Sequence, residues 1–384
     1  MDKRIILAVA GAGKTYTLCN CLNSNERNMI LAFTNRNIYN IQRELIKNYG
    51  TLPKYTKIMT FHSFIYQFGI QPFLPSIFKI FKNKPLKIEG ISLKDPPPQF
   101  KNNRPNPYYI KKDQLGHYID KNNKFFCCRL SELILYLNEK SKKDEKFIHK
   151  ITSRFMMFFD NILIDEFQDF RINDYNFLML FLKQINNVTL VGDYYQHSVS
   201  GQNNHGKPFT NKINSYEKYI QLLQDNKFYT DTTTLVNSRR CSSNICDFVN
   251  SKLNIPIESA KINTGSISKV LAENIDNILS NNSIKKLILQ NPPNGNYSFN
   301  YISWGNSKGD TYDNTCVILT DETDDILEDT FEVKNISQVI RNKLYVALTR
   351  SKGNVYIIQK KLFDSVKNNS ILLFNDIVIF YRFK

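Results

Sequence analysis

The chain has 384 residues, of which 42% are hydrophobic and 13% aromatic, so its composition excludes a disordered chain and allows two or three domains with sizeable cores. Lys and Arg outnumber Asp and Glu by 51 to 35, and the net charge of +16 favours a polyanionic partner, nucleic acid before a membrane surface, although a general Lys- and Asn-rich bias explains part of the excess. The seven Cys include no C-x-x-C pair and the five His show no ligand spacing, which disfavours a disulfide framework, structural zinc and an iron–sulfur cluster.

The first predicted element is a strand over residues 4–9, an apolar run typical of a buried parallel strand. A loop of small residues follows it, and a helix is expected over residues 14–22. Strand, small-residue loop, Lys-Thr and helix in this order are typical of a phosphate-binding P-loop. The loop with its Lys-Thr pair comprises Ala8, Val9, Ala10, Gly11, Ala12, Gly13, Lys14 and Thr15.

This P-loop pattern predicts a polyphosphate site. Backbone N–H groups of such a loop, together with the N-terminus of the helix, supply positive potential. Lys14 is placed to reach the β- and γ-phosphates, and Thr15 to offer its hydroxyl to Mg²⁺. Ala8 stands where the strict G-x-x-x-x-G-K-T pattern has Gly, so the alternative is a chance Gly-Lys-Thr loop on a binding module.

Two further strand–helix steps follow the P-loop. A strand over 28–33 precedes a helix that runs to residue 48, and a strand over 57–60 precedes a helix that begins at Phe61. Strands that alternate with helices predict an α/β fold with a parallel, doubly wound sheet.

Residues 71–150 interrupt this alternation. Prolines concentrate in 92–109, which predicts a loop or extended segment, whereas 130–137 has helical periodicity. We expect a small inserted subdomain here. The charged run 140–146 is interpreted as a solvated surface, with a nucleic-acid contact as the alternative.

The α/β pattern returns with an apolar strand over 161–164 that ends in Asp165 and Glu166. Parallel sheets place their ligands at the carboxyl ends of strands. We therefore expect Asp165 to bind Mg²⁺ through water, and Glu166 to orient and deprotonate an attacking water. The alternative is an acidic helix N-cap. A strand over 188–191 precedes Gln196, which is placed to sense the γ-phosphate.

After about residue 235 the sequence predicts a second α/β region. Its expected elements are helices over 244–253 and 338–348, a turn over 292–295, and strands over 297–303, 315–319 and 355–359.

The most apolar late stretches are 371–374 and 377–380. They are separated by Asn375-Asp376 and are too short to span a bilayer, so a hairpin is predicted. No signal peptide opens the chain. The expectation is a cytoplasmic protein with no membrane partner.

Taken in order, the motifs resemble those of the UvrD/Rep-like superfamily 1 helicases. They occupy residues 8–15, 33–36, 60–64, 165–169, 191–196, 240–245, 308–313 and 345–352. Any one of them has a chance explanation, but the whole set, in order over most of the chain, is very specific. The short interval 246–307 leaves little room for a large 2B-type accessory subdomain, so the resemblance is to a minimal motor.

The resemblance implies two RecA-like domains that bind ATP and Mg²⁺ between them. Residues 1–70 and 151–235 would form the first domain, 236–384 the second, and 71–150 a 1B-like insertion in the first. The implied metal-binding residues are Thr15 and Asp165.

The resemblance also assigns residue roles. The implied catalytic residues are Lys14, Glu166, Gln196, Arg240 and Arg350, the two arginines acting as fingers from the second domain. Tyr16 and Arg239 are candidates to stack on the base. Candidates to contact nucleic acid are Phe33, Thr34, Asn35, Phe61, His62, Phe64, Tyr194 and Lys308. Ordinary core packing is the alternative for Phe61 and Phe64.

The function that these motifs imply is an ATP-dependent translocase on single-stranded nucleic acid, a DNA helicase moving 3′ to 5′, with RNA left open. A second interpretation is a DNA-stimulated ATPase subunit that remodels without processive unwinding and works with a protein partner supplying a nuclease or recognition function. A third is a binding module with a degraded site. The complete set of site residues disfavours it.

Overall fold

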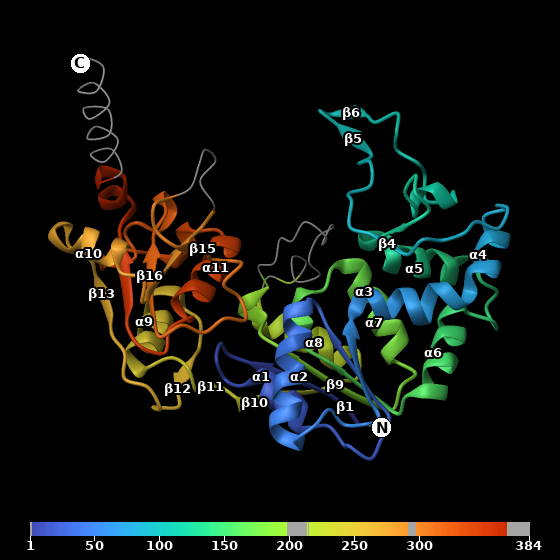
Figure 1. The fold of residues 1–384 in the computed structure, drawn as a ribbon, viewed down its shortest axis with the longest axis horizontal. Helices are drawn as coiled ribbons and strands as arrows, with labels where there is room; N and C mark the ends of the chain where they lie inside the picture. Colours follow the sequence, from blue (N-terminus) through green and yellow to red (C-terminus); the bar gives the residue numbers. More distant parts are fainter. Residues whose placement is uncertain (1, 198–212, 214, 291–296, 367–384) are drawn as a thin grey trace, which may run out of the picture. The chain divides into compact units, whose positions relative to one another are not determined.

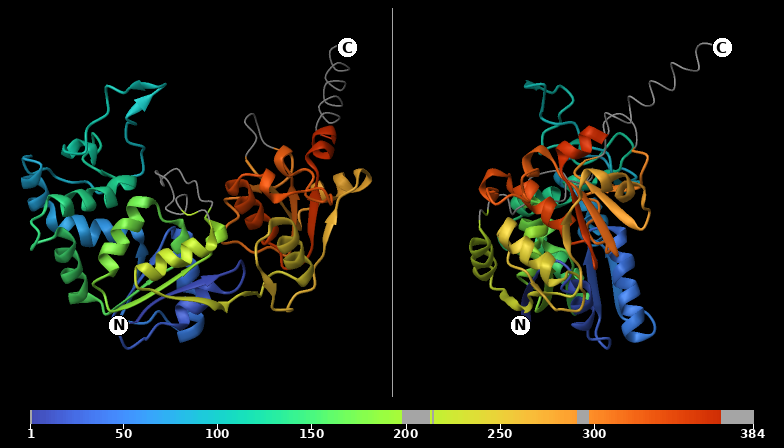
Figure 2. Two further views of the ribbon diagram at one scale, coloured as in Figure 1. Left: turned by 180° about the vertical axis from the view of Figure 1, so that it is seen from behind. Right: turned by 90° about the vertical axis from the view of Figure 1, so that its left-hand side faces the viewer.

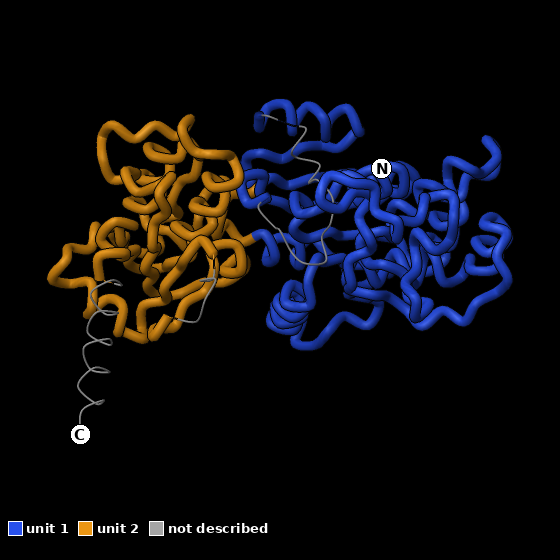
Figure 3. The backbone as a smooth tube through the Cα atoms, turned by 90° about the horizontal axis from the view of Figure 1, so that it is seen from above, with its two compact units in different colours: residues 1–7, 14–234 blue, residues 8–13, 235–384 orange. Residues whose placement is uncertain are grey.

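The computed structural model describes residues 2–197, 213, 215–290 and 297–366. The predicted turn at 292–295 and the predicted hairpin over 371–380 lie outside the described residues. The chain divides into two compact units, which are coloured separately in Figure 3. The first comprises Met1–Leu7 and Lys14–Thr234, and the second comprises Ala8–Gly13 and Leu235–Lys384.

The first unit is built on a six-stranded sheet with the order β10-β1-β9-β8-β2-β3 (Figure 1). Its strands are β1 (Asp2–Ala8), β2 (Asn28–Ala32), β3 (Thr56–Thr60), β8 (Asn161–Ile164), β9 (Asn187–Gly192) and β10 (Tyr229–Leu235). Each neighbouring pair from β1 to β3 is parallel. The parallel, doubly wound α/β fold expected from the sequence is therefore confirmed.

The helices of the first unit begin where the predicted strands end. Thr34, just after β2, accepts a hydrogen bond from the Asn37 N–H and so caps α2 (Asn35–Tyr49), and Gly50, with φ 77°, follows the last residue of this helix. Thr60 at the end of β3 caps α3 (Phe61–Phe64) in the same way, through the Ser63 N–H. These caps satisfy backbone donors that the first turn of a helix leaves unpaired. The P-loop leads into α1 (Lys14–Asn20), shorter than the predicted 14–22.

Residues 71–150 form α4 (Leu74–Ile80), the short strands β4 (Ile91–Ser92), β5 (Phe100–Lys101), β6 (Arg104–Pro105) and β7 (Phe125–Phe126), α5 (Leu130–Lys140) and the start of α6 (Phe147–Phe158). Leu133 and Leu137 of α5 belong to the same hydrophobic core as Phe64 of α3 and Phe181 of α7 (Ile172–Leu182). The insertion therefore shares the core of the first unit. Its β5–β6 hairpin stands away from the helices of that unit (Figures 1 and 2).

The second unit contains a five-stranded parallel sheet with the order β13-β17-β16-β14-β15. Its strands are β13 (Ile267–Lys269), β14 (Ile284–Ile288), β15 (Tyr301–Ser303), β16 (Asn314–Ile318) and β17 (Val355–Ile358). Two helices fall where predicted, α9 (Ser243–Leu253) and α11 (Gln338–Leu348), and α10 (Ile275–Ser280) is an addition.

The predicted strand over 297–303 is shorter than expected. Only Tyr301–Ser303 pairs with β14. The rings of Tyr297 and Phe299 instead stack at 5.0 Å and pack against Phe363. Their alternation gives a strand-like pattern, but aromatic packing rather than a backbone ladder explains it. Among the described residues, no helix combines the length and apolar character that crossing a bilayer requires.

Candidate active site

The carboxyl ends of β8 and β9 lie at one edge of the first sheet, because these strands are neighbours and parallel. Asp165 and Glu166 follow β8 directly, and Gln196 ends a short turn of helix just after β9. The N-terminus of α1 supplies Lys14 and Thr15. The sheet thus brings together the residues that the sequence analysis assigned to one chemical site in the first unit.

The Thr15 hydroxyl donates a hydrogen bond to Asp165 Oδ2 at 3.2 Å. The other carboxylate oxygen of Asp165 accepts from the Glu166 N–H at 2.9 Å. A hydroxyl and a carboxylate held together in this way are the oxygen ligands that Mg²⁺ prefers. The donor set therefore fits the metal that the sequence analysis expected.

Asp165 is buried, and its charge environment is unusual. Burial raises the pKa of Asp165, and the adjacent Glu166 carboxylate raises it further, while the Lys14 ammonium opposes both effects. Two neighbouring carboxylates at a buried position repel each other, and this repulsion favours protonation of one of them. A cation bound beside Asp165 and Glu166 would therefore stabilise the ionised form of their carboxylates.

Glu166 adopts a left-handed backbone conformation, with φ 53° and ψ 46°. Such a conformation is uncommon for a residue with a side chain and persists only where the surroundings impose it. Here the surroundings include Gln168, whose Nε2 donates to Glu166 Oε2 at 2.5 Å. The carboxylate of Glu166 is thus oriented by a neighbour rather than left to rotate.

Gln168 lies within the motif at residues 165–169, but the sequence analysis assigned it no role of its own. It is fully buried, and its Oε1 accepts from the Asp193 N–H at 2.9 Å. Gly192 makes this contact possible, since a Cβ there would lie 2.8 Å from Gln168 Oε1. The two ends of one amide therefore join Glu166 to the end of β9. The sequence shows a Gln after Asp-Glu but not what its two amide atoms reach.

Gln196 is buried at the end of the Tyr194–Gln196 turn. The Asp193 side chain starts this turn by accepting from the Tyr195 N–H at 3.0 Å, and the Gln196 N–H donates to Asp193 O at 3.0 Å. Asp193 therefore bonds to Gln168 through its backbone N–H, and its side chain stabilises the turn that carries Gln196.

The loop residues 8–13 group with the second unit. The Val9 N–H donates to Leu235 O at 3.0 Å, the Ala10 N–H donates to the Tyr345 hydroxyl at 2.8 Å, and the Arg239 N–H donates to Gly11 O at 3.0 Å. Gly11 has φ +74°, and a Cβ there would lie 2.6 Å from Arg240 Cβ, so the loop needs glycine at this position. Tyr345 is a second residue that the sequence analysis did not single out.

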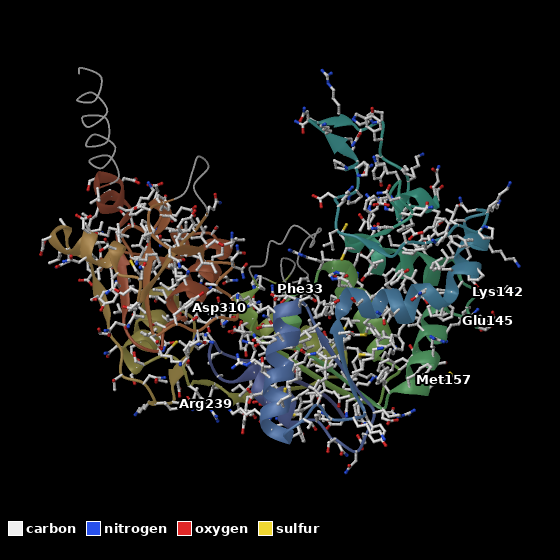
Figure 4. All side chains as sticks on the ribbon, viewed as in Figure 1. Phe33, Lys142, Glu145, Met157, Arg239 and Asp310 are labelled. Atoms are coloured by element: carbon white, nitrogen blue, oxygen red, sulfur yellow. The ribbon has the colours of Figure 1, made fainter. Side chains whose placement is uncertain are left out.

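Arg240 and Arg350 meet at Thr349 within the second unit. Arg240 Nη1 donates to Thr349 O at 3.0 Å, and Arg350 Nη2 donates to Thr349 Oγ1 at 3.3 Å. Arg350 is only 1% exposed, and its Nε and Nη1 donate to the carbonyls of Val346 and Asp310. The structure brings the two predicted arginines together, with their guanidinium groups engaged by their own unit. Figure 4 labels Arg239 and Asp310 in this region.

Three of the predicted nucleic-acid residues are corrected by the structure. Phe61 and Phe64 are fully buried in the core of the first unit, where Phe61 packs on Phe170 and Phe64 on Phe181. They lie three residues apart on a helix and therefore share its inward face. Tyr194 is also buried, and its hydroxyl donates to Ile213 O at 3.3 Å. Core packing, the alternative for both phenylalanines, explains them.

The other candidates remain accessible in part. Phe33, labelled in Figure 4, follows β2 and is half-buried. Its ring is edge-on to that of His62, with a centroid distance of 5.6 Å. Thr34, Asn35 and Tyr16 are exposed, and Lys308 is half-buried in the turn that the Lys308 N–H closes on Gly305 O. Their roles stay predictions.

Comparison with protein families gives two matches. A model described as "AAA domain" matches residues 2–202, and a model described as "Viral superfamily 1 RNA helicase core domain" matches residues 112–359. Each covers more than half of the chain. The second description names viral superfamily 1 RNA helicases, whereas the sequence analysis inferred the UvrD/Rep-like branch. No curated protein matches the chain.

Comparison with solved structures gives low similarity scores. The helicase of PRRSV is 14% identical with a TM-score of 0.44, and the match covers 93% of this chain and 52% of that one. An arterivirus nonstructural protein 10 (helicase) in complex with DNA is 13% identical with a TM-score of 0.43, covering 93% and 61% respectively. The chain therefore spans between half and two thirds of the length of these helicases.

Proposed function

The chain belongs to the superfamily 1 helicase core family, and from that premise we propose that it is an ATP hydrolase that translocates on single-stranded nucleic acid. The observation that supports this most is the contact between the Thr15 hydroxyl and the Asp165 carboxylate, next to a Glu166 that is oriented by Gln168. A P-loop hydroxyl and a strand-end acid in contact are the protein half of an Mg²⁺–nucleotide site.

In this proposal each residue has one task. Lys14 neutralises phosphate charge, Thr15 and Asp165 hold Mg²⁺, and Glu166 takes a proton from the attacking water. The metal, when bound, neutralises charge on the phosphate oxygens. Gln196 contacts the terminal phosphate. Arg240 and Arg350 supply positive charge in the transition state, for which the guanidinium of Arg350 has to exchange its present carbonyl partners.

The nucleic acid is the finer part of the proposal. We propose single-stranded DNA and 3′-to-5′ movement, as the motif resemblance implies. RNA is a second candidate, because the family model that matches residues 112–359 describes RNA helicases. An ATPase subunit that remodels nucleic acid with a protein partner is the alternative activity.

Steady-state ATP hydrolysis, measured without nucleic acid, with single-stranded DNA and with single-stranded RNA, tests these proposals together. We expect strong stimulation by one of the two. Strand displacement on duplexes with a 3′ or a 5′ tail then distinguishes a helicase from a translocase that does not unwind. The tail that supports displacement gives the direction of movement. Basal turnover without any stimulation would favour the partner-dependent ATPase, and no turnover under any condition would overturn the proposed hydrolysis.

A further prediction concerns Gln168. Replacing it with Ala removes the donor to Glu166 and the acceptor for the Asp193 N–H, so kcat should fall about tenfold while the KM for ATP changes little. Gly192→Ala should have the same effect, because its new Cβ displaces Gln168 Oε1. Gln221→Ala, at an exposed glutamine on α8 (Tyr216–Asp225), is the control. A rise in KM with kcat unchanged would show that Gln168 supports nucleotide binding instead.

A further inference from the structure

The insertion carries much of the positive charge of the chain. Residues 71–150 contain 17 Lys and Arg against 8 Asp and Glu, so about a fifth of the chain holds nine of its 16 net positive charges. None of the recognised motifs falls in this segment. Its charge therefore needs an explanation other than the nucleotide site.

One part of the insertion, residues 97–113, is an arm held in a defined shape. Its β5–β6 hairpin turns through Asn102 and Asn103, both with positive φ (51° and 60°), as a two-residue hairpin turn requires. The Asn106 amide donates to Pro98 O at 2.9 Å, and His117 Nδ1 lies 2.6 Å from Ile110 O. The arm projects from its unit in Figures 1 and 2, and these two contacts link its backbone to Asn106 and to His117.

A groove of about 670 Å³ lies between this arm and the C-terminal half of α5. We call it the arm groove. It is lined by the aromatic residues Phe100, Tyr109 and Tyr136 and by the lysines Lys111, Lys112 and Lys140. Two acids, Asp113 and Glu139, also reach it. Phe100 is 57% exposed, far more than an aromatic ring in a core.

The three lysines of the arm groove are exposed and available to a ligand. Among the described residues of the insertion, the ion pairs join Lys87 with Glu89 and Lys150 with Glu145, and His117 contacts Glu132. Lys140 Nζ lies 5.5 Å from the centroid of the Tyr136 ring, and Phe81 stacks on the same ring with a centroid distance of 5.6 Å. One lysine thus lies beside an aromatic ring, and the three lysines of the groove outnumber its two acids.

We propose that the arm groove binds a segment of single-stranded nucleic acid, at a site separate from the motifs recognised in the sequence. The exposed Phe100 ring stacks on an unpaired base and the lysines contact the phosphates, the combination by which proteins bind single strands without reading sequence. In a duplex the bases are already stacked on one another, and the carboxylates of an acidic peptide would engage only the lysines. A single strand, by contrast, offers bases to the aromatic side chain and phosphates to the lysines. The inference rests on the proposed function, which makes nucleic acid the substrate.

Binding of a fluorescent single-stranded oligonucleotide to the full chain, measured by anisotropy over a series of salt concentrations, tests the proposal. Phe100→Ala should weaken binding about tenfold with an unchanged salt dependence, because it removes stacking but no charge. The double variant Lys111→Ala/Lys112→Ala should weaken binding and reduce the slope of log K against log[salt] by about 1.4, since each phosphate contact to a single strand contributes about 0.7.

Matched controls separate this site from general charge and from misfolding. Lys142→Ala/Lys143→Ala removes the same charge from exposed positions just beyond the groove, and Tyr229→Ala removes an exposed ring from β10. Both should bind within about twofold of the parent, and the melting temperatures of all variants should agree.

If the groove variants bind the oligonucleotide as the parent does, the arm groove is not a nucleic-acid site, while the proposed function stands. If the Lys142/Lys143 control loses as much affinity as Lys111/Lys112, charge alone explains binding and the groove is again overturned. If the parent itself binds no single strand, the proposed function fails as well.

Discussion

Lys14→Ala is expected to reduce ATP hydrolysis by about a hundredfold or more, the usual cost of removing a positioned charge from a phosphoryl-transfer site. Lys14 begins α1, directly after the loop, and its charge already acts on the buried Asp165. Single-strand binding should be largely retained, because Lys14 belongs to the proposed nucleotide site and not to the proposed nucleic-acid surface. Steady-state hydrolysis and oligonucleotide anisotropy on the same preparation measure the two effects.

The control for Lys14 is Lys47→Ala, at a lysine of α2 whose side chain is 74% exposed. It removes the same charge from the same unit and should leave turnover unchanged. Unaltered turnover in Lys14→Ala would refute the assignment of the site. Equal loss of oligonucleotide binding would mean that the substitution had disturbed the fold of the first unit.

Glu166→Gln is expected to lower kcat by a factor of about 10² to 10⁴, the usual contribution of a general base, with ATP binding retained. The substitution keeps the size of the side chain. Its amide oxygen can still accept from Gln168 Nε2, so the strained backbone at Glu166 loses no partner. What it removes is the capacity to take a proton from water.

Nucleotide binding by a fluorescent analogue, alongside single-turnover hydrolysis, distinguishes these effects. Glu217→Gln, at an exposed carboxylate on α8, is the matched control and should behave as the parent. Loss of nucleotide binding in Glu166→Gln would point to a structural role for Glu166. The pattern expected here, binding without turnover, would distinguish Glu166, the proposed general base, from Asp165, the proposed metal ligand, whose loss should weaken both nucleotide binding and turnover.

The elements of the two sheets could be predicted from local patterns. The strands over 28–33 and 161–164 are short apolar runs, and parallel strands are buried on both faces, so their sequence carries its own signal. The helix over 338–348 was predicted with the residues that α11 has. The strand over 297–303 was predicted too long because Tyr297 and Phe299 occupy alternate positions, as the buried residues of a strand do. In the structure their rings pack against Phe363 instead.

Some roles of the candidate site residues could be predicted from the sequence, whereas others depend on neighbours that are distant in the chain. Thr15 and Asp165 are 150 positions apart, yet their contact follows once two strands are known to be parallel and close, because strand ends then meet at one edge. Phe61 and Phe64 could not be assigned in this way. An aromatic residue after a strand has the same local pattern whether its ring faces a ligand or the core.

The sequence by itself determined the class of the fold, the P-loop and the identity of the acidic residues that follow β8, because these depend on local periodicity and on fixed spacing. Only the tertiary structure decided which side chains are accessible, how one amide of Gln168 joins Glu166 to Asp193, and that the arm forms a groove with α5. The residues that bury a side chain or bond to it are often remote in sequence. A local sequence pattern does not say how close such residues lie in the folded chain.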